Sequence, residues 1–87
     1  LAAGAFPETE GDLFAWTEQE FEHRLAGNPI RRIGHERWLR NIAVALGNGT
    51  PTVNAKKALK MKIDHSSELV REHVAWALNK LATLDLY

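Results

Sequence analysis

The feature that most constrains the fold of this chain is a run of apolar residues with helical spacing near its centre. From His35 onward the chain places apolar side chains every three or four residues, at Trp38, Ile42, Ala45 and Leu46. This spacing puts them along one side of an α-helix. A Gly-Asn-Gly break follows at residues 47–49, so the pattern predicts a helix that begins near His35 and stops there.

The opposite side of this predicted helix is basic. Arg37, Arg40 and Asn41 lie about half a turn from the apolar stripe, with Val44 among them, and Arg31 and Arg32 lie just before the helix. Guanidinium groups match phosphate with paired hydrogen bonds, and the N-terminus of a helix attracts anions. We therefore expect one side of the helix to stabilise the fold and the other side to bind an anion.

The chain before this helix predicts a linker and one more helix. Residues 1–11 have no periodicity and predict a mobile linker, whereas residues 12–16 are apolar enough to pack on the domain. The stretch from Thr17 to Glu20 has the sequence of a capping box, which begins a helix. That helix has Phe21 and Leu25 on one side and should end at Gly27.

Two helices are predicted after the central one. Thr50 is the expected N-cap of the third helix and Pro51 lies in its expected first turn. The apolar side of this helix should consist of Ala55, Ala58, Leu59 and Ile63. The fourth helix, from about Ser67 to Ala82, should pack through Val70, Val74, Ala77, Leu78 and Leu81.

A second side of the fourth helix is also apolar. It consists of Leu69, His73 and Trp76, and a domain of this size has little material left to cover it. An exposed apolar strip is typical of a surface that meets another domain or protein. We therefore predict that these three residues face a partner.

The apolar pattern of the central helix recurs in the fourth helix, 32 positions later. Trp38 and Ile42 correspond to Val70 and Val74, and each of the two helices follows a shorter helix and a break. A repeat of this length built from helix pairs is typical of an α-solenoid. We therefore predict an all-α fold over residues 12–87, a small α-solenoid of two antiparallel helix pairs. The second unit resembles a HEAT repeat, a resemblance that implies a structural role for Asp64 and Arg71 in bracing a turn.

The net charge of zero conceals an uneven distribution. Residues 1–22 contain six acids and no base, whereas residues 23–62 contain nine bases and a single acid. A basic middle of this kind indicates nucleic-acid or phosphate binding, and we add Lys56 and Lys60 to the predicted interface. Lysines also commonly do no more than solvate a helix surface, and this alternative stays open.

Nothing in the sequence predicts catalysis or metal binding within this chain. It has no cysteine, and its four histidines lack the spacing of a known metal site. Asp64, His65 and Ser66 or Ser67 are neighbours in a predicted turn, where such residues cap helices. No apolar run reaches the roughly 20 residues of a membrane-spanning helix, and no signal peptide is visible. The chain begins at Leu1, so we interpret it as a fragment of a longer protein.

Three stretches together resemble a known family. They are Phe14-Ala-Trp-Thr-Glu-Gln-Glu-Phe21, then Ile30-Arg-Arg-Ile-Gly-His-Glu-Arg-Trp-Leu-Arg-Asn-Ile-Ala-Val-Ala-Leu-Gly-Asn48, then Leu69-Val-Arg-Glu-His-Val-Ala-Trp-Ala-Leu78. They are similar to the C-terminal region of bacterial epoxyqueuosine reductase, a cytoplasmic enzyme that reduces epoxyqueuosine to queuosine in tRNA. The resemblance implies that cobalamin and two [4Fe–4S] clusters belong to an upstream catalytic domain.

Two functions follow as alternatives. The resemblance implies a monomeric, non-catalytic domain that binds the tRNA anticodon stem-loop, and the arginines, His35 and Asn41 are the expected contacts. The competing hypothesis is a helical module that binds its own catalytic domain or a partner protein. Trp38 lies on the apolar stripe, so we expect it in the core rather than at either interface.

Overall fold

The computed structural model describes residues 10–85, with side chains described as far as residue 82, and every regular element in this range is helical. The five α-helices and one 3₁₀-helix are α1 (Glu10–Phe14), α2 (Glu18–Arg24), η2 (Pro29–Ile33), α3 (His35–Asn48), α4 (Val53–Lys60) and α5 (Glu68–Asp85). This confirms the all-α prediction, with two short helices, α1 and η2, beyond the four that were expected. Glu10 and Gly11 belong to α1, whereas the rest of the predicted linker lies outside the described residues.

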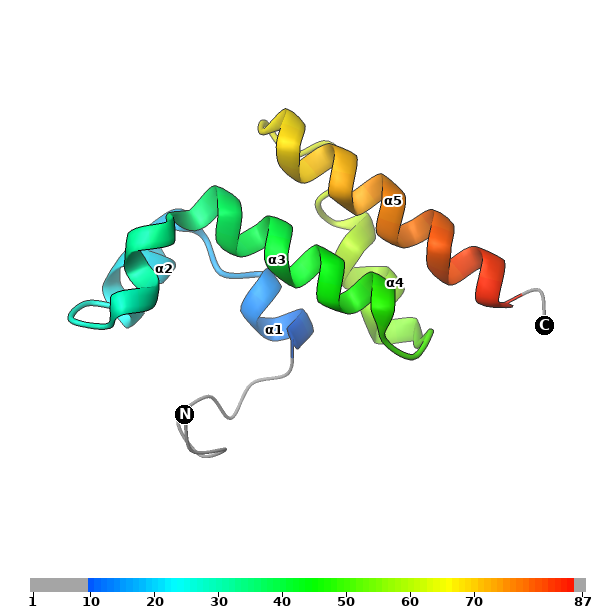
Figure 1. The fold of residues 1–87 in the computed structure, drawn as a ribbon, viewed down its shortest axis with the longest axis horizontal. Helices are drawn as coiled ribbons and strands as arrows, with labels where there is room; N and C mark the ends of the chain where they lie inside the picture. Colours follow the sequence, from blue (N-terminus) through cyan, green and yellow to red (C-terminus); the bar gives the residue numbers. More distant parts are fainter. Residues whose placement is uncertain (1–9, 86–87) are drawn as a thin grey trace.

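The two longest helices, α3 and α5, lie side by side and run in the same direction (Figure 1). The short helices α1 and α4 contact each other, α1 also contacts α3, and α4 contacts α5. The offset of 32 positions therefore relates two helices that are neighbours in space. Assigning these units to the HEAT class stays a prediction, because it rests on the sequence pattern.

The core forms where the predicted apolar stripes meet. Leu39, Ala43, Leu59, Val70, Val74, Ala77 and Leu81 are fully buried, and Trp38, Ile42 and Leu46 nearly so. Ala45, which the spacing placed on the stripe, is only half-buried. The buried side of α3 is therefore rotated slightly from the predicted stripe, toward Leu39 and Ala43.

An aromatic cluster joins α1, α2 and α3. The rings of Trp16 and Trp38 stack with centroids 5.6 Å apart, and Phe21 contacts Trp38 at 5.4 Å. The guanidinium of Arg24 lies over the Trp16 ring, 5.0 Å from its centroid. Trp38 is 8% exposed, which confirms its prediction as a core residue.

The start of α2 confirms the capping box. Thr17 Oγ1 accepts the backbone N–H of Glu20, and Glu20 Oε1 accepts the N–H of Thr17, both at 3.1 Å. Accepting the backbone N–H of Thr17 as a carboxylate lowers the pKa of Glu20. The helix ends at Arg24, three residues before the predicted stop, although Gly27 does adopt a φ of +80°.

The start of α4 differs from the prediction. Thr52, rather than Thr50, is the N-cap, because its Oγ1 accepts the backbone N–H of Ala55 at 3.0 Å. Pro51 therefore lies before the cap instead of in the first turn. The helix ends at Lys60, so Ile63 lies in the following turn and is half-exposed instead of extending the apolar side.

Candidate nucleic-acid interface

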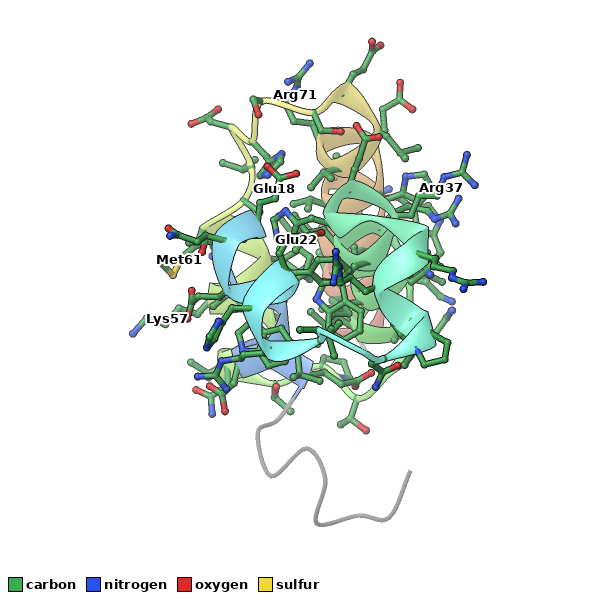
Figure 2. The ribbon with its side chains drawn as sticks, turned by 90° about the vertical axis from the view of Figure 1, so that its left-hand side faces the viewer. Glu18, Glu22, Arg37, Lys57, Met61 and Arg71 are labelled. Atoms are coloured by element: carbon green, nitrogen blue, oxygen red, sulfur yellow. The ribbon has the colours of Figure 1, made fainter. Side chains whose placement is uncertain are left out.

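The outward side of α3 is a stripe of four residues at helical spacing, which we call the α3 stripe: Arg37, Asn41, Val44 and Asn48. Arg37 is exposed and extends from the ribbon into solvent (Figure 2). Among the side chains of residues 10–82, none forms an ion pair with it. The guanidinium at the start of this stripe can therefore meet an anion without giving up an internal carboxylate.

The matching positions of α5 form a second stripe 32 residues later, which we call the α5 stripe: Leu69, His73, Trp76 and Lys80. Residues from both stripes line one hollow of about 450 Å³, namely Val44, Asn48, Glu72, His73 and Trp76. Lys80 Nζ also donates a hydrogen bond to Asn48 Oδ1. The stripe that contains Arg37 and Asn41, predicted to bind nucleic acid, therefore lies beside the stripe predicted to face a partner, and we call the two stripes together the shared face.

Trp76 is the large aromatic side chain of this face and is 42% exposed. One edge of its ring lies against α3, because a Cβ atom placed on Gly47 would come within 2.7 Å of Trp76 Cζ3. The ammonium group of Lys80 lies 5.2 Å from the ring centroid. Contacts from both helices therefore fix the position of the indole while leaving part of it open to solvent.

His73 lies beside Trp76 in the hollow. Its Nδ1 is 2.8 Å from the carbonyl oxygen of Leu69, and because a carbonyl only accepts, Nδ1 must donate. In the neutral imidazole this leaves Nε2 as the acceptor. His73 thus adds a polar group to a hollow with an aromatic wall.

The arginines before α3 differ in their surroundings. Arg31 Nε lies 3.0 Å from Glu22 Oε1, in a pair that is about half-exposed. Arg32 is exposed on η2, and no residue of the described range pairs with it. Arg40 is half-buried, and its Nε donates to Asn41 Oδ1 at 3.0 Å. Of this group, Arg32 and Arg37 present the most accessible positive charge.

His35 is directed into the fold. Its Nε2 lies 2.8 Å from the carbonyl oxygen of Trp16, to which it donates, and its ring packs on Phe21 with centroids 5.7 Å apart. Its Nε2 is therefore already used to hold the α1–α2 turn against α3. Contact between His35 and RNA stays a prediction. The structure shows that His35 also has a structural role, which competes with such a contact.

The predicted lysines do not lie beside the arginines. Lys56, Lys57 and Lys60 surround the exposed side chains of Val53 and Met61. Figure 2 shows Lys57 and Met61 on the side of the molecule opposite to Arg37. The basic middle of the sequence is therefore divided into an arginine surface on α3 and a lysine surface on α4.

The turn before α5 is held by Arg71, as its predicted structural role requires. Its Nη1 donates to the carbonyl oxygens of His65 and Ser66, at 2.6 and 3.0 Å. Ser67 Oγ accepts the backbone N–H of Val70 and donates to Glu36 Oε2. His65 Nδ1 accepts the backbone N–H of Ser67 at 3.0 Å, so this serine and histidine cap and brace the helix.

Burial lowers the pKa of His65, and the nearby charges of Lys62, His35 and Arg71 lower it further. The pKa of Lys62 is also lowered, again chiefly by burial. Its ammonium lies 5.9 Å from the centre of the Phe14 ring. Both groups are therefore structural parts of the region where α4 leads into α5.

The sequence pattern placed Val44 on the arginine side of the helix but left two other members of the shared face, Asn48 and Lys80, unassigned. Their signal was the 32-residue offset itself, because it pairs Val44 with Trp76 and Asn48 with Lys80. Applied to polar as well as apolar positions, the offset predicts that the arginine side of α3 and the Leu69, His73 and Trp76 side of α5 are neighbours.

The donor set of this chain does not fit an iron–sulfur cluster, which needs thiolate ligands, because the sequence has no cysteine. Among the side chains of residues 10–82, no three of His, Asp or Glu come together to hold a metal ion. None of the helices described there has both the length and the apolar character needed to cross a bilayer.

Comparison with known proteins gives a consistent set of relatives. An epoxyqueuosine reductase of Pseudomonas aeruginosa is 55% identical over 69 residues, 79% of this chain, and one of Xanthomonas campestris is 59% identical over 66 residues, 76% of it. The chain is homologous to part of the epoxyqueuosine reductases. The Escherichia coli epoxyqueuosine reductase is 52% identical over 68 residues, 77% of this chain.

The alignment covers only a small fraction of the length of each reductase. The chain spans only 17–19% of the length of the three epoxyqueuosine reductases. No family model and no solved structure matches it. The similarity is therefore to one segment of these enzymes, and most of each enzyme lies outside the aligned segment.

Proposed function

We propose that this chain is a non-catalytic, C-terminal RNA-binding domain of an epoxyqueuosine reductase, which positions the anticodon stem-loop of a tRNA. The observation that supports this most directly is the position of Arg37. It begins an outward stripe of α3, pairs with no carboxylate among the side chains of residues 10–82, and shares that stripe with Val44 and Asn48, which line the hollow. Arg32 adds a second exposed guanidinium before the helix.

The physical basis of this function is phosphate binding on a rigid support. Guanidinium groups that neutralise phosphates release counterions, so affinity falls steeply as salt rises. The buried contact of α3 with α5 holds the arginines in a fixed arrangement. A stem-loop bound in this way would present its wobble base to a separate catalytic domain at little further entropic cost.

The redox chemistry belongs elsewhere in this proposal. The sequence resemblance assigns cobalamin and two [4Fe–4S] clusters to an upstream domain of the cytoplasmic enzyme, and this chain has no thiolate to contribute. Its own residues bind and orient the RNA. A monomer is sufficient for that role, because the proposed phosphate contacts and the hollow all lie within one chain.

The experiment is a titration of a fluorescently labelled anticodon stem-loop RNA with the chain at several salt concentrations. The variant Arg32→Ala/Arg37→Ala should weaken binding and reduce the salt slope by about two, one for each lost phosphate contact. The matched control is Lys57→Ala/Lys60→Ala, which removes the same charge from the opposite side. Circular dichroism verifies that both variants stay helical. Equal losses in the two variants would show that only net charge matters and would contradict the proposal.

A second candidate function is docking to the catalytic domain or to a partner protein. The lysine surface supports it, because Val53 and Met61 are 81% and 76% exposed among the lysines of α4. Met61 is the single methionine of the chain, so labelling its methyl carbon gives one NMR signal. Adding the remainder of the parent enzyme should shift that signal, and an unchanged signal would exclude docking at α4.

A further inference from the structure

We propose that Trp76 is a stacking platform for an unpaired base of the bound RNA, so that the face selects a single-stranded loop over a duplex. The inference rests on the proposed function and adds a second contact to it. Arg37 would bind the phosphate backbone, while the hollow between the α3 and α5 stripes would receive a base.

The first reason is the position of the indole. Trp76 is 42% exposed, whereas the other two tryptophans, Trp16 and Trp38, are 5% and 8% exposed. Its ring forms one wall of a hollow of about 450 Å³, which is within the range of sites that hold small ligands. Planar bases stack on exposed aromatic side chains of single-strand binding proteins, largely independently of sequence.

The second reason is that the ring is already held in place. Gly47 lets α5 approach α3 so closely that a single added carbon would collide with Trp76. Lys80, itself hydrogen-bonded to Asn48, lies 5.2 Å from the ring centroid. A side chain fixed in this way loses little conformational freedom on binding, so more of the stacking energy appears as affinity.

The third reason is the chemistry of the rim. His73 has one ring nitrogen engaged with Leu69, which leaves Nε2 to accept from a base in the neutral imidazole. Glu72 also lines the hollow, and a carboxylate accepts from exocyclic amino groups but repels phosphate. The hollow therefore suits the hydrogen-bonding edge of a base rather than the backbone.

The fourth reason is continuity with the arginine. Val44 of the hollow lies seven residues from Arg37 on the same stripe, which is about 10 Å along the helix axis at 1.5 Å per residue. A short strand whose backbone meets Arg37 can thus extend along α3 and place a base at Trp76. Charge complementarity favours RNA over an apolar peptide, because this face begins in a guanidinium that pairs with no carboxylate among the side chains of residues 10–82 and ends in an ammonium group.

The test uses the intrinsic fluorescence of the chain, with an RNA hairpin as the probe and a blunt duplex of equal phosphate count as the control. Because Trp16 and Trp38 are buried, the RNA-dependent signal should come from Trp76. We expect the hairpin to quench the fluorescence and the duplex to leave it nearly unchanged. The variant Trp76→Phe should remove the quenching but keep most of the affinity, since phenylalanine also stacks.

The affinity of Trp76→Ala provides the decisive comparison. It should bind the hairpin at least about fivefold more weakly than the unchanged chain, as expected for one lost stacking contact. Its affinity for the duplex should equal that of the unchanged chain. The inference would be overturned if Trp76→Ala lost affinity equally for both RNAs. It would also be overturned if Trp76→Ala bound the hairpin with unchanged affinity and the hairpin did not quench the unchanged chain. Either result would leave phosphate binding intact. Quenching by the remainder of the parent enzyme but not by RNA would assign the hollow to a protein and also overturn it. Failure of the unchanged chain to bind either RNA would instead overturn the proposed function.

Discussion

Gly47 of α3 lies directly against Trp76 of α5, because a Cβ atom at Gly47 would be 2.7 Å from Trp76 Cζ3 and 3.0 Å from Ala77 Cα. Among the glycines from Gly27 onward, Gly47 has the least space for a side chain. Parallel packing of α3 and α5 therefore depends on a residue without a side chain, at a position where the backbone is helical and needs no positive φ.

Replacing Gly47 by alanine should destabilise the domain. Overpacking a close contact costs about 1–3 kcal/mol, which exceeds the roughly 1 kcal/mol that alanine gains over glycine inside a helix. Urea unfolding should show this loss. The control is Gly49→Ala, where the new Cβ would meet its nearest atom at an ordinary 3.4 Å and the change should stay within about 0.5 kcal/mol. Equal stability of the two variants would mean that the helices can separate at no cost.

Replacing His35 by alanine should weaken the fold. The substitution removes the hydrogen bond from Nε2 to Trp16, worth about 1 kcal/mol, and the contact with Phe21. His23→Ala is the matched control, since His23 is exposed on α2. Thermal unfolding of the two variants compares them directly. A lower melting temperature for His23→Ala than for His35→Ala would contradict the structural role of His35.

Replacing Ser67 by alanine should cost about 1 kcal/mol, the usual value of a lost N-cap. Ser67 Oγ accepts the N–H of Val70 and also donates to Glu36 at the start of α3. Ser66→Ala provides the control, because Ser66 contributes its backbone carbonyl to Arg71, and the substitution keeps that carbonyl. Hydrogen exchange of the first amides of α5 should increase in the Ser67 variant alone, and unchanged exchange there would refute the cap.

Stability should fall as the pH is lowered from 7 to 5, in part through His65. Burial lowers the pKa of His65 in the folded chain, so the unfolded chain binds the proton first, near its ordinary pKa of about 6.5. Stability is therefore lost as the pH falls through that value. The interval lies above the range in which Glu20 titrates. His65→Gln should flatten this dependence when unfolding is followed at each pH, and an unchanged slope would contradict the contribution of His65.

The local features of the fold could be predicted from the sequence because they depend on neighbouring residues. The capping box of α2 and the buried stripe of α5 follow from spacing alone. The N-cap of α4 could not be decided in this way. Thr50 and Thr52 flank the same proline, and the choice between them depends on where the chain leaves α3.

The candidate site was less predictable, because its composition depends on how the helices pack. Charge clustering in sequence placed Lys56 and Lys60 with Arg37, whereas packing puts α3 and α4 on opposite sides. The same packing joined Arg37 to Trp76, which the sequence had assigned to different functions. Periodicity shows which residues share one side of a helix. It does not show toward which side of the domain they face, because that depends on how the helices pack.

The separation of the arginine and lysine surfaces also makes them distinguishable by covalent labelling. Four of the five lysines lie between Lys56 and Lys62, on or just after α4, whereas α3 contains arginine but no lysine. An amine-selective acylating reagent therefore reads out mainly the α4 side, and a dicarbonyl reagent selective for guanidinium reads out the α3 side. A ligand that protects one group of side chains from modification while leaving the other reactive reports directly which surface it covers.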